Sequence, residues 1–328
     1  MQIIRELQNV SCYPNPVVTI GNFDGVHLGH QKIFKKVEAK AKEINGIPIA
    51  ITFDPHPVRV LAPERGLKIL TTFGDKADLM SNSGIKVLIS IGFDKEFART
   101  DPDDFIRNVL IDKIGAKWIV VGHNYAFGKG KKGTPALLRR RGRKYGFGVS
   151  VVRYAKVYDD IVSSSRVRSL LLRGRVCEAL KMLGRAYHIE GTVIKGLGRG
   201  ASLLHTPTAN ITAPNELVPK EGVYAVRVSL YETEKSPIHR FTDSPIRVYD
   251  GVANIGKNPT FGDVPVSYEV HIFDFSRNLL GEKIRIHFID RIRDEKKFSG
   301  IKELEDRIKK DIEKAKEILA KRRDILYL

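Results

Sequence analysis

Continuous apolar runs alternate with helical patterns in the first 122 residues, and this alternation limits the folds that the chain can adopt. The runs are Val17–Ile20, Ile47–Phe53, Val87–Ile91 and Trp118–Val121. Apolar residues at helical spacing lie between them, over about 29–44, 74–83 and 102–114. Because these runs have no polar face, they are typical of parallel strands that helices cover on both sides. The pattern predicts an open α/β sheet, in which ligands bind at the carboxyl ends of the strands.

The pattern changes near residue 186, where the expected strands become short and their apolar residues alternate with polar ones. They are His188–Ile194, Val223–Leu230, Arg247–Ala253, Tyr268–Phe273 and Lys283–Phe288. Short strands with frequent Gly, Pro and Asn between them predict a small antiparallel barrel or sandwich. An apolar stripe over about 300–323 predicts a final helix. We therefore expect two domains, residues 1–185 and residues 186–328.

The net charge of +18 is concentrated in the first of these domains. Residues 1–185 carry a balance of +15, against +3 for residues 186–328. A basic domain favours polyanionic ligands, which include nucleotides, nucleic acid and anionic lipid. Charge alone does not choose among them.

Several classes of protein do not fit the sequence. No window of about 18 apolar residues exists, so we expect no transmembrane helix and no membrane partner. The charged start, Met1–Glu6, lacks the apolar core of a signal peptide. Cys12 and Cys177 form neither a metal spacing nor a disulfide framework. These features predict a cytoplasmic protein and leave open whether it forms a homo-oligomer.

The stretch Gly21-Asn-Phe-Asp-Gly-Val-His-Leu-Gly-His30 follows the first expected strand and opens the first expected helix. His27 and His30 are three residues apart, so both rings lie near one face, beside the free N–H groups at the positive end of the helix. The glycines of this stretch let the backbone approach a phosphate closely. Packing or capping by the two histidines is the plain alternative. The whole stretch instead favours an anion site.

This stretch resembles the His-x-Gly-His signature of the nucleotidyltransferase superfamily, and the FMN adenylyltransferase module of bacterial FAD synthetases in particular. Three further segments resemble that module: Thr52-Phe-Asp-Pro-His-Pro57, Gly122-His-Asn-Tyr-Ala-Phe-Gly128 and Ser163-Ser-Ser-Arg-Val-Arg168. Ala126 stands where the family often has a basic residue. The resemblance implies a Rossmann-like domain that transfers an adenylyl group from ATP to FMN.

The resemblance also implies roles for individual residues. His27 and His30 would be catalytic and donate to phosphate oxygens of ATP. ATP would also contact Gly21, Asn22, Phe23, Asp24 and Gly29 in the loop, with Ser164 and Arg168 holding the outgoing pyrophosphate. His56 and Asn124 would help to seat the flavin.

The segment Thr206-Pro-Thr-Ala-Asn-Ile211 follows the glycine-rich stretch Lys195–Gly200. Taken alone, it is as well explained by a turn between two strands. It resembles, however, the Pro-Thr-Ala-Asn motif of riboflavin kinase domains. That resemblance implies that Thr208 and Asn210 hold Mg²⁺ bound to ATP, because hydroxyl and amide oxygens suit this ion. Gly198 and Gly200 would belong to the ATP-binding flap.

Three other segments resemble the kinase family: Gly184–Val193, Asn254–Gly262 and Tyr268–His271. The last implies that Glu269 is the catalytic base for the riboflavin 5′-hydroxyl. Asn254, and Arg293 from the segment Ile292–Phe298, would contact the flavin.

We therefore expect a bifunctional enzyme that uses ATP and Mg²⁺ to convert riboflavin to FMN and FMN to FAD. His205-Thr206 replaces the Gly-Phe that usually precedes Pro-Thr-Ala-Asn in the family. This difference keeps an alternative open, an adenylyltransferase with a degenerate kinase domain. A third reading, a flavin- or RNA-binding protein without turnover, is disfavoured by the intact histidine pair.

Eight Lys or Arg residues and no acid occur within 129–144. A run of this kind is usually a solvated face, whereas a nucleic-acid patch is the sharper alternative. The FAD synthetase family also places basic residues after the Phe-Gly segment. We expect a solvated face that partly serves the nucleotide, and no nucleic-acid partner.

Overall fold

The computed structural model describes residues 1–195, 208–213, 215–230, 247–256, 267–296 and 298–323. The chain divides into two compact units, Met1–Ser163 and Ser164–Leu328, and each is described by itself. None of the described helices has the length and apolar character that crossing a bilayer requires.

The first unit is built on a six-stranded sheet in which every neighbouring pair is parallel. The strand order is β1 (Gln2–Ile4), β4 (Val87–Gly92), β3 (Pro48–Asp54), β2 (Val17–Ile20), β5 (Trp118–Gly122) and β6 (Gly148–Val152). The four strands expected from continuous apolar runs are all present. The open α/β sheet is confirmed.

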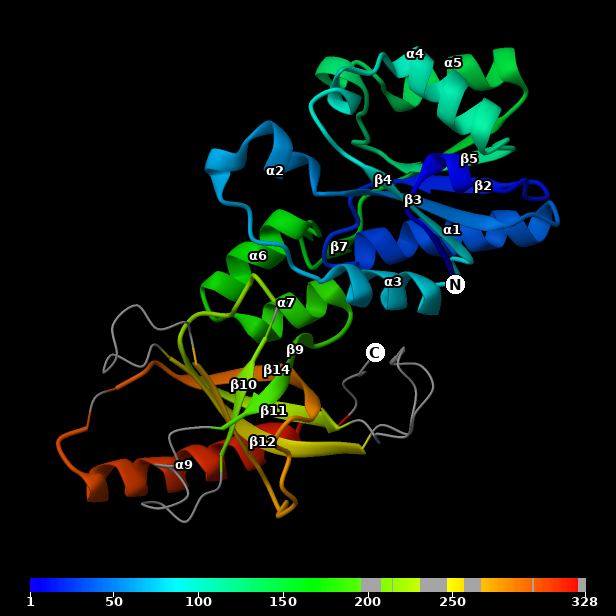
Figure 1. The fold of residues 1–328 in the computed structure, drawn as a ribbon. Helices are drawn as coiled ribbons and strands as arrows, with labels where there is room; N and C mark the ends of the chain where they lie inside the picture. Colours follow the sequence, from blue (N-terminus) through cyan, green and yellow to red (C-terminus); the bar gives the residue numbers. More distant parts are fainter. Residues whose placement is uncertain (196–207, 214, 231–246, 257–266, 297, 324–328) are drawn as a thin grey trace. The chain divides into compact units, whose positions relative to one another are not determined.

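Helices cover both faces of this sheet (Figure 1). One face packs against α1 (Leu28–Glu43) and α3 (Phe73–Asn82), through a buried cluster that includes Phe34, Val37 and Met80. The other packs against the π-helical segment η4 (Phe105–Lys113) and α5 (Pro135–Tyr145), through a second cluster that includes Phe105 and Leu138. The apolar runs have no polar face because each strand contributes side chains to both clusters.

Shorter elements complete the first unit. They are η1 (Leu7–Asn9), α2 (Pro57–Leu61), η2 (Pro63–Arg65), η3 (Phe97–Arg99), α4 (Pro102–Asp104), η5 (Lys129–Lys131), β7 (Lys156–Val157) and β8 (Asp160–Ile161).

The strand order reverses at β2. From β2 the chain moves to β3 and β4 on one side, and then crosses to β5 on the other side. The connections that leave β2 and β5 therefore diverge at the carboxyl edge of the sheet, which is where open α/β sheets form their ligand sites. The glycine-rich stretch after β2 lies at this switch point.

The second unit contains a closed barrel of six antiparallel strands, in the order β10 (Ala209–Thr212), β13 (Ser267–Ile272), β12 (Arg247–Gly256), β11 (Gly222–Leu230), β14 (Lys283–Arg293) and β9 (Tyr187–Ile194). Pairing of β10 with β9 closes the ring. The antiparallel barrel expected after residue 186 is confirmed.

Among the described residues, the barrel is accompanied by α6 (Ser164–Leu172), α7 (Val176–Leu183) and α9 (Ile301–Ala320). Ala315 and Leu319 of α9 are fully buried in a cluster with Ala225 and Phe273. The Arg227 guanidinium donates at 3.1 Å to the carbonyl of Leu319, where the last carbonyls of a helix lack partners within it. The expected final helix is thus anchored both by its apolar stripe and at its end.

Helices α6 and α7 are grouped with the barrel, so the second compact unit begins at Ser164. The sequence analysis placed the division near Arg185, where the pattern of the expected strands changes. It stays a prediction.

Candidate functional site

The loop between β2 and α1 has an unusual backbone. Phe23, Gly25 and Val26 all have positive φ angles, 49°, 81° and 39° respectively. Such angles are costly for residues that carry a Cβ, and they persist only where the surroundings fix them. Burial provides that constraint, since Phe23 and Val26 are 2% and 1% exposed.

Asp24 connects the same loop to the segment that contains Leu70 and Thr71. Its buried carboxylate accepts hydrogen bonds from the backbone N–H groups of Leu70, at 3.0 Å, and Thr71, at 3.2 Å. The N–H of Gly25 donates in turn to the Thr71 hydroxyl at 3.2 Å. The carboxylate thus holds the loop in place. A direct ATP contact by Asp24 stays a prediction.

The two histidines are stacked at the start of α1. Their ring centroids are 3.6 Å apart and their planes differ by 18°. His27 is the N-cap of the helix, and its Nδ1 accepts from the backbone N–H of His30 at 3.4 Å. Because Nδ1 accepts, a neutral His27 carries its proton on Nε2 and can donate there.

The surroundings of the pair fix the two rings. Phe23 meets the His30 ring edge-on, with centroids 5.3 Å apart. A Cβ at Gly29 would lie 3.0 Å from Cε1 and 3.1 Å from Nδ1 of His27, so any larger residue between the two histidines would crowd the His27 ring. His27 is buried and His30 half-buried. The helix end and the two rings form a site suited to an anion.

Neighbouring strands bring other predicted residues to the same edge of the sheet. Asn22 lies two residues after the end of β2, and its carbonyl accepts from the Thr52 hydroxyl of β3 at 3.3 Å. His56 follows β3, and its Nδ1 caps α2 by accepting from the N–H of Val58 at 3.2 Å. Asn124 follows β5 and is exposed. Asn22, His56 and Asn124 therefore follow three parallel strands at one edge of the sheet, and their contacts with ligands stay a prediction.

Ser164 and Arg168 lie in the first two turns of α6, in the second compact unit. Both are half-buried. Their contact with the pyrophosphate stays a prediction.

The basic run falls on η5 and α5. Arg139, Arg140, Arg143 and Lys144 are exposed, whereas the Nε of Arg141 donates to Asp103 at 2.6 Å. Helix α5 covers the face of the sheet opposite to α1 (Figure 1).

A second group of predicted residues forms a row across three barrel strands. Asn210 of β10 is paired with Glu269 of β13, and Glu269 is paired with Asn254 of β12. Directly opposed residues of antiparallel strands point to the same side of the sheet. The barrel thus aligns an amide, a carboxylate and a second amide, although the three residues are far apart in the sequence.

Glu295 extends this row, and the sequence analysis did not single it out. The Asn254 amide donates to Glu295 Oε1 at 3.4 Å. The Oδ1 atom of Asn254 is buried and accepts no hydrogen bond from the described residues. A Cβ at Gly256 would lie 1.9 Å from Glu295 Oε1, so a side chain at this position would displace the carboxylate.

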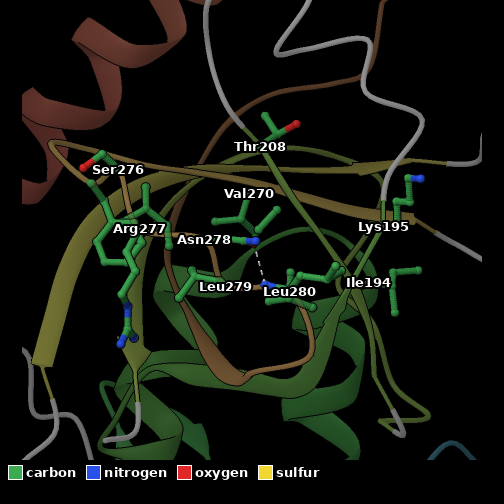
Figure 2. Close-up of a pocket in the computed structure, with 13 residues that line it drawn as sticks. Ile194, Lys195, Thr208, Val270, Ser276, Arg277, Asn278, Leu279 and Leu280 are labelled. Atoms are coloured by element: carbon green, nitrogen blue, oxygen red, sulfur yellow. Dashed lines mark hydrogen bonds between the residues drawn. The ribbon is translucent and has the colours of Figure 1, made fainter.

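A pocket of about 380 Å³ opens at the end of the barrel (Figure 2). Its wall includes Thr208, Val270 and Ile272, together with the loop from Phe275 to Leu280. Leu279 and Leu280 supply apolar surface, and Asn278 Oδ1 accepts from the N–H of Leu280 at 3.0 Å. Val270 faces the pocket while its neighbour Glu269 points to the other side of β13, because side chains alternate along a strand.

Arg293 has partners within the protein. Its Nε donates to both carboxylate oxygens of the buried Asp311 on α9, at 2.8 and 3.1 Å. Its Nη1 donates to the carbonyl of Asp294 at 3.0 Å. This geometry ties the end of β14 to α9. A direct contact of Arg293 with flavin stays a prediction.

Some predicted features lie outside the described residues. They are Gly198 and Gly200 of the flap, the His205-Thr206 pair and residues 257–262 of the central loop. Within the described residues, no group of three or more His, Cys, Asp or Glu side chains is placed to hold a metal ion.

Comparison with known proteins assigns a family to both units. A family model described as FAD synthetase matches residues 10–166, and one described as riboflavin kinase matches residues 183–319. A Haemophilus influenzae protein named bifunctional riboflavin kinase/FMN adenylyltransferase is 35% identical over 320 residues, which cover 96% of this chain and 98% of that protein. A Bacillus subtilis protein with the same name is 36% identical and covers 91% of each chain.

This chain belongs to the bifunctional riboflavin kinase/FMN adenylyltransferase family. The resemblance expected from the motifs is therefore confirmed. A crystal structure described as a macrolide-efflux protein from Streptococcus pneumoniae shares the fold, with a TM-score of 0.83 and 29% identity. The match covers 94% of this chain and 96% of that protein.

Within this family architecture, two features were missed by the sequence analysis. Glu295 lies inside the segment Ile292–Phe298, whose resemblance was noted, and its place two residues after Arg293 was a usable signal. The loop from Phe275 to Leu280 carries no such signal, because apolar residues after a strand usually indicate core. Only the closed barrel shows that Leu279 and Leu280 line a pocket.

Proposed function

We propose that this protein converts riboflavin to FMN and then FMN to FAD, with ATP as the second substrate of both reactions. The stacked pair of His27 and His30 at the start of α1 is the observation that carries the proposal. It is supported by the site's place at the switch point of the parallel sheet, and by family membership over both units.

For adenylyl transfer, the FMN phosphate attacks the α-phosphorus of ATP and pyrophosphate leaves. Negative charge then accumulates on the phosphate oxygens that surround the reacting phosphorus. The Nε2–H of His27, the His30 ring and the first N–H groups of α1 would donate to those oxygens. Donors that are already in position stabilise this charge without reorganising, and the reaction needs no covalent intermediate on the protein. Ser164 and Arg168 would hold the pyrophosphate.

For phosphorylation of riboflavin, Glu269 would accept the proton of the 5′-hydroxyl while the γ-phosphoryl group of ATP is transferred. Asn254 would orient the flavin, since its buried Oδ1 has an unused acceptor site among the described residues. The apolar pocket beside Thr208 would take part of the nucleotide. Thr208 lines this pocket and lies two residues before Asn210, so the start of β10 connects the pocket with the row.

Mg²⁺ fits the donors at the start of β10. The Thr208 hydroxyl and the Asn210 amide oxygen are hard ligands of the kind that this ion prefers. They would hold the ion together with phosphate oxygens of ATP, where it would neutralise developing charge. Removal of divalent ions with EDTA should therefore stop the formation of FMN from riboflavin.

An adenylyltransferase with an inactive kinase unit is the second candidate, favoured by His205-Thr206 in place of Gly-Phe. Incubation of the purified protein with riboflavin and Mg²⁺-ATP, followed by chromatography, distinguishes the two. We expect FMN to appear first and FAD to follow, with pyrophosphate released in proportion to FAD. FAD from added FMN, but no FMN from riboflavin, would support the second candidate. Failure to form either product would refute the proposal.

A further inference from the structure

Lys76 is a buried lysine next to the adenylyltransferase site. It lies in the first turn of α3, directly after the segment whose N–H groups hold Asp24, and it is only 7% exposed. Lysine is almost never this buried unless its charge has partners. None of the roles derived above uses it.

Hydrogen bonds connect Lys76 with the loop that precedes the histidines. The Nζ of Lys76 lies 3.5 Å from the Thr52 hydroxyl oxygen, and that hydroxyl lies 3.3 Å from the carbonyl oxygen of Asn22. An ammonium can only donate and a carbonyl can only accept, so the direction of both bonds is determined. Lys76 donates to Thr52, and Thr52 donates to Asn22.

The surroundings of Lys76 act on its ammonium group in opposite directions. Burial lowers the pKa of Lys76, whereas the carboxylates of Asp24 and Asp54 act in the opposite direction. Asp24 belongs to the β2–α1 loop and Asp54 to the end of β3, so the ammonium interacts with both elements that border the histidine site. A buried charge of this kind is often neutral or unfavourable for stability compared with an apolar side chain.

We propose that Lys76 is a positioning residue for adenylyl transfer, which it serves by holding the Asn22–Asp24 loop through Thr52 in the conformation that binds the phosphates of ATP. This inference rests on the proposed adenylyltransferase function. Lys76 acts through Thr52 and the loop, not by touching the substrate.

The test is a set of matched variants assayed for FAD formation at saturating FMN and varied Mg²⁺-ATP. Lys76→Met removes the charge at similar volume, Lys76→Arg keeps it, and Thr52→Val removes the connecting hydroxyl. Lys86→Met is the control, since Lys86 is exposed and precedes β4 at the opposite edge of the sheet. Thermal unfolding and riboflavin phosphorylation are measured on the same preparations.

We expect Lys76→Met to lower kcat/KM for ATP on the order of 10-fold to 100-fold, the range seen when the hydrogen-bond partner that orients a metal-binding side chain is removed. Thr52→Val should give a smaller loss, and the double variant should be no worse than Lys76→Met, because both changes break one connection. Lys76→Arg should recover most of the activity. Kinase turnover and the Lys86→Met control should match the wild type.

Two results would overturn the role of Lys76. One is an unchanged kcat/KM for ATP in Lys76→Met, and the other is losses in Lys76→Met and Thr52→Val that multiply in the double variant. If Lys76→Met does not fold, the other two variants test the role of Lys76. Full activity of Thr52→Val would contradict it, and so would a Lys76→Arg variant that folds but is inactive. A wild type that makes no FAD would instead refute the adenylyltransferase function itself.

Discussion

At the scale of single residues, His27 has two tasks that substitution can separate. It caps α1 through Nδ1, and in the neutral ring this leaves Nε2 as the donor. The motif predicted both histidines, because their spacing and the strand–turn–helix context are visible in the sequence. The role of Asp24 was not predictable, since its partners Leu70 and Thr71 are 46 and 47 residues away. Nothing local to Asp24 indicates which backbone it will hold.

His27→Asn should lose FAD formation while the helix keeps its cap. Asparagine is a good N-cap, so the helix start is preserved, but the donor at the Nε2 position is lost. We expect a fall in rate on the order of 10²–10³. His27→Ala should show the same fall and lose in addition about 1 kcal/mol of stability. Steady-state kinetics and urea unfolding measure the two effects, and a fully active His27→Asn would show that the imidazole is only a cap.

Gly29→Ala should lower the rate of FAD formation without lowering the stability of the protein. Alanine favours a helix over glycine by about 1 kcal/mol, so the melting temperature should hold or rise. Its Cβ, however, would come within 3.0 Å of the His27 ring and displace it. We expect the rate of FAD formation to fall about tenfold, because the displaced His27 ring no longer holds its donor in the right direction. An unchanged rate in the folded variant would mean that the ring position does not matter.

At the scale of elements, strands with continuous apolar runs were predicted and short elements were not. Strand β10 has four residues, and the sequence explained this segment equally well as a turn. Its hydrogen bonds come from β9 and β13, which are distant in the sequence, so no local pattern specifies it. The expected helix over 102–114 forms, but most of it is π-helical. Apolar periodicity indicates which face is buried, not which hydrogen-bond pattern the backbone adopts.

Strands β14 and β11 bring a buried histidine next to arginines. His287 is 2% exposed, and its Nε2 lies 2.8 Å from the Ser229 hydroxyl. Burial lowers the pKa of His287 well below its ordinary value, and the nearby His188, Arg285, Arg185 and Arg227 lower it further. The folded state therefore keeps this ring neutral at a pH where the unfolded chain binds a proton.

The barrel unit should accordingly lose stability as the pH falls below about 6.5, the ordinary histidine pKa, and keep the full contribution above it. One such group adds a slope of at most about 1.4 kcal/mol per pH unit. His287→Gln retains a partner for Ser229 but does not titrate, so its unfolding free energy should depend less steeply on pH. Denaturant unfolding between pH 5 and pH 8 compares the two proteins. Parallel curves would contradict the assignment to His287.

At the scale of the whole molecule, the predicted site residues are divided between the two compact units. The histidine pair lies in the first unit, whereas the row of Asn210, Glu269 and Asn254 lies in the second, as do Ser164 and Arg168. The change from a parallel sheet to a barrel was predicted because the periodicity of apolar residues changes near residue 186. The sequence did not predict which compact unit α6 and α7 belong to, because amphipathic helices between two domains can pack on either domain.

Two single-site variants should therefore complement each other in a mixture. Glu269→Gln should abolish FMN formation but still convert added FMN to FAD, and His27→Asn should do the reverse. Mixed together with riboflavin and Mg²⁺-ATP, they should make FAD, because FMN from one molecule can be used by the other. Chromatography follows both flavins. Absence of FAD from the mixture, with each variant active in its own half-reaction, would show that FMN does not pass through solvent.

The closure of the barrel into a ring determines how the alignment of Asn210, Glu269 and Asn254 can be lost. Each of the six strands is bonded on both sides, so there is no outer strand from which unzipping could start. A shift of β13 by a single residue would turn Glu269 inward and Val270 outward, and it would break two ladders at once. The carboxylate and the amides beside it thus stay aligned until the entire ring opens, and backbone amides across the ring should exchange with deuterium as one cooperative group.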